Sequence, residues 1–252
     1  MEDAVKSFLD YTSNFLENED YNIKLKIDHT FRVMNLCEKI AKSLNLSLED
    51  VNLAKLCGLL HDIGRFEQWN SYKTFVDSKS VDHGDFGAEL LMNESFMRLF
   101  NSNCENDNLI INVVRNHNKY KLPKLSEREK LFNNIVRDAD KTDILYLYTI
   151  NDIKVDIGSD CFSDEVFKCL QENKLIDRDL KKNKADSLAI SLAFVFDINY
   201  CKTFDILKDN EYLDKELDIY LNKTTNQKLV DQLNEFRKIV NNYIDRRCSY
   251  VR

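Results

Sequence analysis

Apolar residues recur at helical spacing along almost the whole chain. Apolar positions three or four residues apart predict amphipathic helices, because this spacing places the side chains on one face. The expected helices cover residues 2–17, 26–45, 47–62, 82–100, 106–118, 126–149, 163–172, 184–206, 208–221 and 225–247. No internal repeat, low-complexity tract or Pro/Gly-rich linker separates them. The pattern predicts an all-α fold in one domain covering residues 1–252.

Several of the expected helices begin with residues that favour helix N-termini. Ser, Thr, Asp and Asn cap helices because the side-chain oxygen accepts a hydrogen bond from a free backbone N–H of the first turn. The expected caps are Ser47, Ser163 and the two capping-box pairs Ser126–Glu129 and Thr224–Gln227.

Residues 64–81 carry no clean helical stripe, and we expect them to form a long loop. The segment contains the aromatic residues Phe66, Trp69, Tyr72 and Phe75. A long loop beside a functional site can act as a lid. We favour the simpler interpretation, in which the aromatic side chains dock the loop on the core.

The composition supports the helical interpretation. The chain contains five Gly and one Pro, where average usage gives about 18 and 13 in this length. Sandwiches, barrels and doubly wound sheets need these residues in their many tight turns. A chain of 252 residues is also a normal size for one large globular domain.

Charge and cysteine content limit the partners and the compartment. With 36 basic and 43 acidic residues, the net charge is −7, which argues against nonspecific nucleic-acid or anionic-membrane binding. The acidic residues 2–3 do not resemble a secretory signal, and the nearly apolar run 188–196 is far shorter than the roughly 20 residues that span a bilayer. Seven scattered cysteines without a Cys-x-x-Cys pair indicate free thiols. We therefore expect a cytoplasmic protein, and the sequence leaves its oligomeric state open.

The four histidines of the chain and two of its aspartates fall on the apolar stripes of expected helices. They are His29, His61, Asp62, His83, His117 and Asp140. A single inward histidine is most often a satisfied core residue. An inward carboxylate, however, costs several kcal/mol unless it is paired or binds a metal. Taken together on several helices, this set favours a metal site in the bundle interior, with two metals if one aspartate bridges.

The same residues resemble the H…HD…D signature of the HD-domain superfamily of metal-dependent phosphohydrolases. His29 lies in DHTFRV, His61-Asp62 in LLHDIGR and Asp140 in DADKTDIL. His83 in DHGDFGAELL and His117 in RNHNKY occupy the order in which binuclear branches place two further histidines. The resemblance covers about residues 24–150, the HD core, and leaves about 151–252 as a C-terminal helical extension.

The resemblance implies a ligand set for two divalent metals. His29, His61, Asp62 and Asp140 would hold the first, and His83, His117 and a bridging Asp62 the second. Imidazole and carboxylate ligands without thiolate suit Mn²⁺, Fe²⁺, Co²⁺, Ni²⁺ or Zn²⁺, and Mg²⁺ stays open as well.

A phosphate ester needs cations beside its non-bridging oxygens. Arg65, three residues after Asp62, is the first candidate, and Arg32 and Lys141 are second choices for substrate binding. The alternative for each is an ordinary surface ion pair. Asp62 and Arg65 are the residues expected to carry catalysis.

The leading hypothesis is a phosphomonoesterase or phosphodiesterase that acts on a small phosphorylated metabolite such as a nucleotide. The stretch NHNKYKLP lacks the doubled histidine and Gly-x-Gly-Tyr-Pro run of the HD-GYP branch, so cyclic-dinucleotide cleavage is not supported. One alternative is a di-iron oxygenase similar to the myo-inositol oxygenase family. The other is a non-catalytic sensor that binds a nucleotide.

Overall fold

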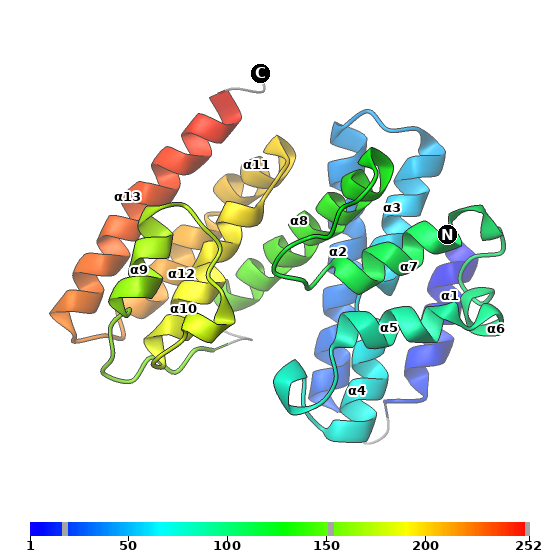
Figure 1. Cartoon of the computed structure of the whole chain (residues 1–252), viewed down its shortest axis with the longest axis horizontal. Helices are drawn as coiled ribbons and strands as arrows, with labels where there is room; N and C mark the ends of the chain where they lie inside the picture. The colour runs from blue at the N-terminus through cyan, green and yellow to red at the C-terminus, as the bar shows by residue number, and fades with distance from the viewer. Residues whose placement is uncertain (17–19, 151–153, 250–252) are drawn as a thin grey trace. The chain divides into compact units, whose positions relative to one another are not determined.

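Helices are the only regular secondary structure in the described residues, 1–16, 20–150 and 154–249 of a computed structural model, and no strand occurs in them (Figure 1). The α-helices are α1 (Glu2–Ser13), α2 (Tyr21–Ser43), α3 (Leu48–Leu60), α4 (Gly64–Tyr72), α5 (His83–Met92), α6 (Glu94–Met97), α7 (Asp107–Asn116), α8 (Glu127–Thr149), α9 (Asp164–Gln171), α10 (Ala185–Leu192), α11 (Cys201–Asp209), α12 (Tyr212–Leu221) and α13 (Gln227–Ser249). Short 3-10 helices are η2 (Asp77–Lys79), η3 (Cys104–Asn106), η4 (Arg178–Leu180) and η5 (Ala193–Asp197). The predicted all-α fold is confirmed. Residue 17 of the first expected helix, and residues 151–153 and 250–252 of the expected extension, lie outside the described residues.

Two of the expected helices are interrupted. The range 82–100 divides at Asn93, whose extended backbone ends α5 and whose side chain accepts from the Phe96 N–H to cap α6. The range 184–206 divides into α10, η5 and α11, with extended backbone at Ile198 and Tyr200 between the last two. Periodicity alone missed these breaks because the apolar spacing continues across them.

The prediction of a loop over residues 64–81 is wrong for its first half, which forms α4. Phe66 on this helix is fully buried and meets the ring of Phe8 edge-on at 5.6 Å between centroids. Tyr72, in contrast, is 48% exposed and does not dock on the core. Burial of Phe66 explains how a helix forms without a regular apolar stripe.

Two of the predicted helix caps are confirmed. The Ser47 side chain accepts from the N–H of Asp50 at the start of α3. The capping box at the start of α8 is reciprocal, since Glu129 accepts from the Ser126 N–H at 2.8 Å and Ser126 Oγ accepts from the Glu129 N–H at 3.3 Å. These bonds satisfy backbone donors that the helix itself leaves free.

The other two caps differ from the prediction. Ser163 occupies the N-cap position of α9, but its hydroxyl makes no capping hydrogen bond. Helix α13 begins at Gln227, where the Asn226 side chain accepts from the Leu229 N–H at 3.3 Å. The cap is therefore Asn226, and the prediction of Thr224 is wrong by two residues.

The chain divides into two compact units, Met1–Asp140 and Lys141–Arg252. The division falls within α8, so this helix contributes residues to both units. The predicted single cooperative domain stays a prediction, because compactness does not measure whether the units unfold together.

The first unit is built around the antiparallel pair α2 and α3, and α5 packs against both α4 and α7. Its core contains fully buried apolar side chains from most of its helices, including Phe8, Val33, Ile40, Leu59, Phe66, Val113, Ile135 and Val136. The histidines and aspartates described below lie among these residues.

The second unit has its own apolar core. In this unit α13 packs against α9, α11 and α12, and the buried side chains include Phe162, Leu188, Leu192, Phe204, Leu217 and Phe236. Across the described residues, no helix is both long and apolar enough to cross a bilayer.

Candidate metal centre

The six predicted ligands converge in the first unit, and they form two groups that share Asp62. In the first group, the Nε2 atoms of His29 and His61 lie 3.2 Å apart. Asp140 Oδ1 lies 3.2 Å from His29 Nε2 and 3.7 Å from His61 Nε2. Asp62 Oδ2 lies 3.6 Å from each of the same two nitrogens. An oxygen of Asp140 and an oxygen of Asp62 therefore both face the same pair of histidine nitrogens.

The second group faces the other oxygen of Asp62. The Nε2 atoms of His83 and His117 lie 3.0 Å apart. Asp62 Oδ1 lies 3.4 Å from His83 Nε2 and 3.5 Å from His117 Nε2. Each oxygen of one buried carboxylate thus faces its own pair of histidines.

These separations fit ligands that share a metal ion. Two donors each about 2.1 Å from a metal lie about 3.0–3.4 Å apart at angles near 90–109°, and about 3.5–3.7 Å apart at angles near 115–125°. The two groups contain imidazole and carboxylate donors and no thiolate, which suits divalent ions such as Mn²⁺, Fe²⁺, Co²⁺, Ni²⁺ or Zn²⁺. The residues present therefore fit a divalent metal in each group.

Backbone carbonyls select the tautomers of two histidines. His61 and His117 each follow the last residue of a helix, α3 and α7. Their Nδ1 atoms lie 2.8 Å from the Gly58 carbonyl oxygen and 2.7 Å from the Val114 carbonyl oxygen. A carbonyl can only accept, so Nδ1 carries the proton and Nε2 keeps its lone pair for a metal.

A carboxylate does the same for His83, the first residue of α5. Its Nδ1 lies 2.7 Å from Asp77 Oδ2. With Nδ1 as the donor, the Nε2 lone pair points at the lone pair of His117, only 3.0 Å away. Two facing lone pairs repel each other, and a cation between them and Asp62 removes that repulsion.

Burial keeps two of these imidazoles neutral. It lowers the pKa of His61 to about 4. Burial, aided by the charge of Arg65, lowers the pKa of His83 to about 4 as well. Both rings are therefore unprotonated at neutral pH, which is the form that binds metals.

The two aspartates are ionised. Burial alone would raise the pKa of Asp62, but the charge of Lys26, together with that of Arg65, outweighs burial and holds that pKa well below its usual range. Burial also opposes ionisation of Asp140, and its hydrogen bond to His29 lowers the pKa of Asp140 nevertheless. The centre therefore presents two negative charges.

A close approach between α4 and α5 brings His83 to the centre. A β-carbon built on Gly64 would lie 2.5 Å from the His83 carbonyl oxygen and 2.7 Å from the Gly87 nitrogen. Both contacts are with backbone, which cannot rotate away. Glycine at position 64 thus allows α5 to pass directly behind the His61-Asp62 turn.

Helix α8 holds the end of α7 that carries His117. The Arg137 guanidinium on α8 is buried, and its Nη1 donates to the carbonyl oxygens of Asn116 at 3.1 Å, His117 at 3.0 Å and Lys119 at 2.6 Å. These carbonyls lie at the C-terminus of α7 and in the residues just beyond it, where the helix itself supplies few donors. Arg137 had no recognisable signal in the sequence, because its partners are about 20 positions away.

Arg65 belongs to a network that also holds His83. Its Nη1 donates to Gln68 Oε1 at 2.8 Å, to the Phe75 carbonyl oxygen at 2.7 Å and to Asp77 Oδ1 at 2.9 Å. Its Nε is buried without a hydrogen bond and lies 3.5 Å from Asp62 Oδ1. Arg65 is thus anchored at one end and directed at the bridging carboxylate at the other.

Asp77 is a second residue that sequence analysis missed. Its carboxylate accepts from His83, from Arg65 and from the fully buried amide of Gln68. It lies in η2, in the segment that was expected to be a loop. A carboxylate behind a metal-binding histidine orients the ring and makes it a stronger ligand.

The two second-choice cations lie in different surroundings. Arg32 lies on α2 and is half-buried. Lys141 is buried in the second unit, with Nζ 2.9 Å from Asp197 Oδ2 and 5.8 Å from the Phe194 ring centroid. Their roles in substrate binding stay predictions.

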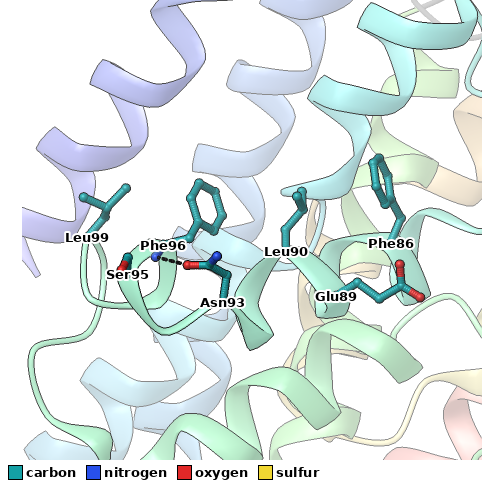
Figure 2. Close-up of a pocket in the computed structure, with 7 residues that line it drawn as sticks. All are labelled: Phe86, Glu89, Leu90, Asn93, Ser95, Phe96 and Leu99. Carbon is teal, nitrogen blue, oxygen red and sulfur yellow. Dashed lines mark hydrogen bonds between the residues drawn. The ribbon is translucent and has the colours of Figure 1, made fainter.

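A separate hollow of about 670 Å³ lies over α5 and α6 in the first unit (Figure 2). Its lining is Phe86, Glu89, Leu90, Asn93, Ser95, Phe96 and Leu99. None of these is a predicted metal ligand, and the hollow is not assigned to the metal centre.

Fold and site together define a helical domain with His/Asp clusters that could hold divalent metals. The family model described as HD domain matches residues 27–145, and this match supports the resemblance of that segment to the HD-domain superfamily. The match contains all six predicted ligands. Members of this family are generally metal-dependent phosphohydrolases, and an HD domain implies divalent metal binding. No curated protein and no solved structure matched the chain.

Proposed function

We propose that the protein is a two-metal phosphohydrolase that cleaves a phosphomonoester or phosphodiester of a small metabolite such as a nucleotide. One observation carries the proposal: the two oxygens of Asp62 face separate histidine pairs, His29 with His61 and His83 with His117. A carboxylate so placed suits a bridge between two metals.

In this proposal His29, His61, Asp62 and Asp140 hold one metal, and His83, His117 and Asp62 hold the other. When bound, such a pair of metals lowers the pKa of a water and stabilises the charge that develops on the oxygens around phosphorus.

The charge of the centre supports a phosphate ester as the substrate. The neutral His61 and His83 add no charge, and Asp62 and Asp140 contribute two negative charges. Two divalent ions therefore leave an excess of two positive charges. A phosphomonoester dianion matches that excess, and a phosphodiester monoanion satisfies part of it.

Arg65 is the proposed catalytic cation beside the metals. Its Nη1 is held by three acceptors, so no side-chain freedom has to be lost when its Nε–H meets a phosphoryl oxygen. A donor fixed in advance in a buried site stabilises transition-state charge more than a mobile one. Arg32 and Lys141 are the two second-choice cations proposed for substrate binding.

The test is a turnover assay of protein stripped with a chelator and reconstituted separately with Mn²⁺, Fe²⁺, Co²⁺, Ni²⁺, Zn²⁺ or Mg²⁺. The substrates are p-nitrophenyl phosphate, bis(p-nitrophenyl) phosphate and a panel of nucleotides. We expect phosphate release under nitrogen with at least one non-oxidisable metal. Turnover only with iron and with consumption of O₂ would point instead to the oxygenase chemistry, and nucleotide binding without turnover to a sensor.

A further inference from the structure

One lysine reaches the bridging carboxylate directly. Lys26 lies on α2, and its Nζ is 2.7 Å from Asp62 Oδ2. The Lys26 side chain is 18% exposed, whereas that of Asp62 is 3% exposed. The ammonium group therefore lies at the rim of the centre, between solvent and the buried ligands.

The residues packed around Lys26 orient its side chain. It precedes His29 by three residues on one helix, so both side chains lie on the same face. Its Nζ lies 5.6 Å from the centroid of the Phe75 ring, which packs against Trp69 at 4.8 Å between centroids. The Trp69 Nε1–H donates to Asp20 Oδ2 at 2.6 Å, and Asp20 caps the helix that carries Lys26.

Metal binding would change the partner of Lys26. The oxygen that it contacts is one of the proposed metal ligands, and a metal neutralises the charge that now holds the ammonium. A phosphoryl group at the metals would then offer this ammonium a new anionic partner. Lysine suits this exchange, because its three donors rotate freely and act as a point charge.

We infer that Lys26 binds a non-bridging phosphoryl oxygen of the substrate and acts beside Arg65 at the mouth of the metal centre. The inference rests on the proposed function. It adds a substrate contact that lies just before the matched HD segment, residues 27–145.

The test compares Lys26→Met, which keeps the length of the side chain, and Lys26→Arg, which keeps the charge, with the wild type. Lys39→Met is the matched control, because Lys39 is an exposed lysine on the same helix. Metal content is measured first. Binding of inorganic phosphate to the metal-loaded proteins is then followed by calorimetry, and KM and kcat are measured with p-nitrophenyl phosphate.

We expect Lys26→Met to retain its metals and to bind inorganic phosphate at least tenfold more weakly, with a rise in KM. A charge-assisted hydrogen bond has about this strength. Lys26→Arg should stay within about threefold of the wild type, and Lys39→Met should not differ from it.

Three results would overturn the inference. If the wild type is active and Lys26→Met keeps the same phosphate affinity and the same KM, Lys26 does not contact the substrate. The proposed function would then still stand. Loss of metal in both Lys26 variants would make Lys26 a structural partner of Asp62. A metal-loaded wild type that neither binds phosphate nor hydrolyses esters would overturn the proposed function and the inference together.

Discussion

His83 and His117 direct their Nε2 lone pairs at each other across 3.0 Å, while Asp77 and the Val114 carbonyl hold the Nδ1 protons of the two rings. Neither ring can turn its lone pair away without breaking the hydrogen bond at its other nitrogen. Both rings are therefore already oriented so that a cation could bind between them. The groups that hold the rings can be tested by substitution in the same way as the candidate ligands.

Asp77→Ala tests the support behind His83. We expect occupancy of the second metal site to fall, with a 10–100-fold loss of affinity, because the ring loses its fixed tautomer and orientation. Asp85→Ala is the control, since Asp85 is a half-exposed aspartate on α5 that pairs with Lys119. Metal titrations of both variants make the comparison, and equal affinities would show that Asp77 does not support the site.

Arg65→Ala tests the proposed cation beside the metals. We expect metal content to stay intact and turnover of phosphate esters to fall by about 10²-fold or more, as when one fixed charge-stabilising donor is removed. Metal analysis and kinetics on the same preparation distinguish a role in stabilising transition-state charge from a structural role. If the variant loses metal instead, Arg65 acts through Asp77 and His83 and is structural.

Gly64→Ala tests the close approach of α4 and α5. The added methyl group would meet backbone atoms of His83 and Gly87 at 2.5–2.7 Å, so the helices must separate. We expect a loss of about 1–3 kcal/mol in the free energy of unfolding and weaker metal binding. The control is Asn70→Ala at an exposed position of the same helix. If both changes have an equally small effect on stability, Gly64 is not needed for the close approach of α4 and α5.

The metal-free protein should lose stability as the pH falls from about 6.5 to about 4. His61 and His83 have pKa values lowered to about 4 by burial, whereas in the unfolded chain they titrate near 6.5. In this window the unfolded state binds protons that the folded state does not, at about 1.4 kcal/mol per pH unit for each histidine.

Urea unfolding of chelator-treated protein at several pH values measures this dependence. Above about pH 6.5 both histidines are neutral in the folded and in the unfolded state. They should therefore make no contribution to the pH dependence of the free energy of unfolding. A free energy of unfolding that is constant between pH 6.5 and 4.5 would show that the two rings are not buried as neutral imidazoles.

The clustering of the six candidate ligands could be predicted because each carries a local signal. Imidazoles and carboxylates on apolar stripes are costly without a partner, and a shared metal would provide one for all six. Their supports carry no such signal. Lys26 contacts a residue 36 positions away, and Arg137 contacts carbonyls 18–21 positions away, so both look like ordinary helix-surface cations in the sequence.

The errors in the fold have a related cause. Helix α4 was missed because its stability comes from Phe66 and from contact with α5 rather than from a regular stripe. The break at Asn93 was missed because a side-chain cap ends one helix and begins the next within an unbroken apolar pattern. In both places tertiary contacts or capping outweigh periodicity.

The central claim is that Asp62 bridges two metals. The most direct test is the metal-to-chain ratio of untagged protein purified anaerobically without chelators, compared with Asp62→Ala and with Asp10→Asn, which changes an exposed carboxylate on α1. We expect close to two metals per chain in the wild type and in Asp10→Asn. Asp62→Ala should lose most of the metal and all activity, because one substitution removes a ligand from both sites. A single metal in the wild type, or retained metal and turnover in Asp62→Ala, would contradict the two-metal account.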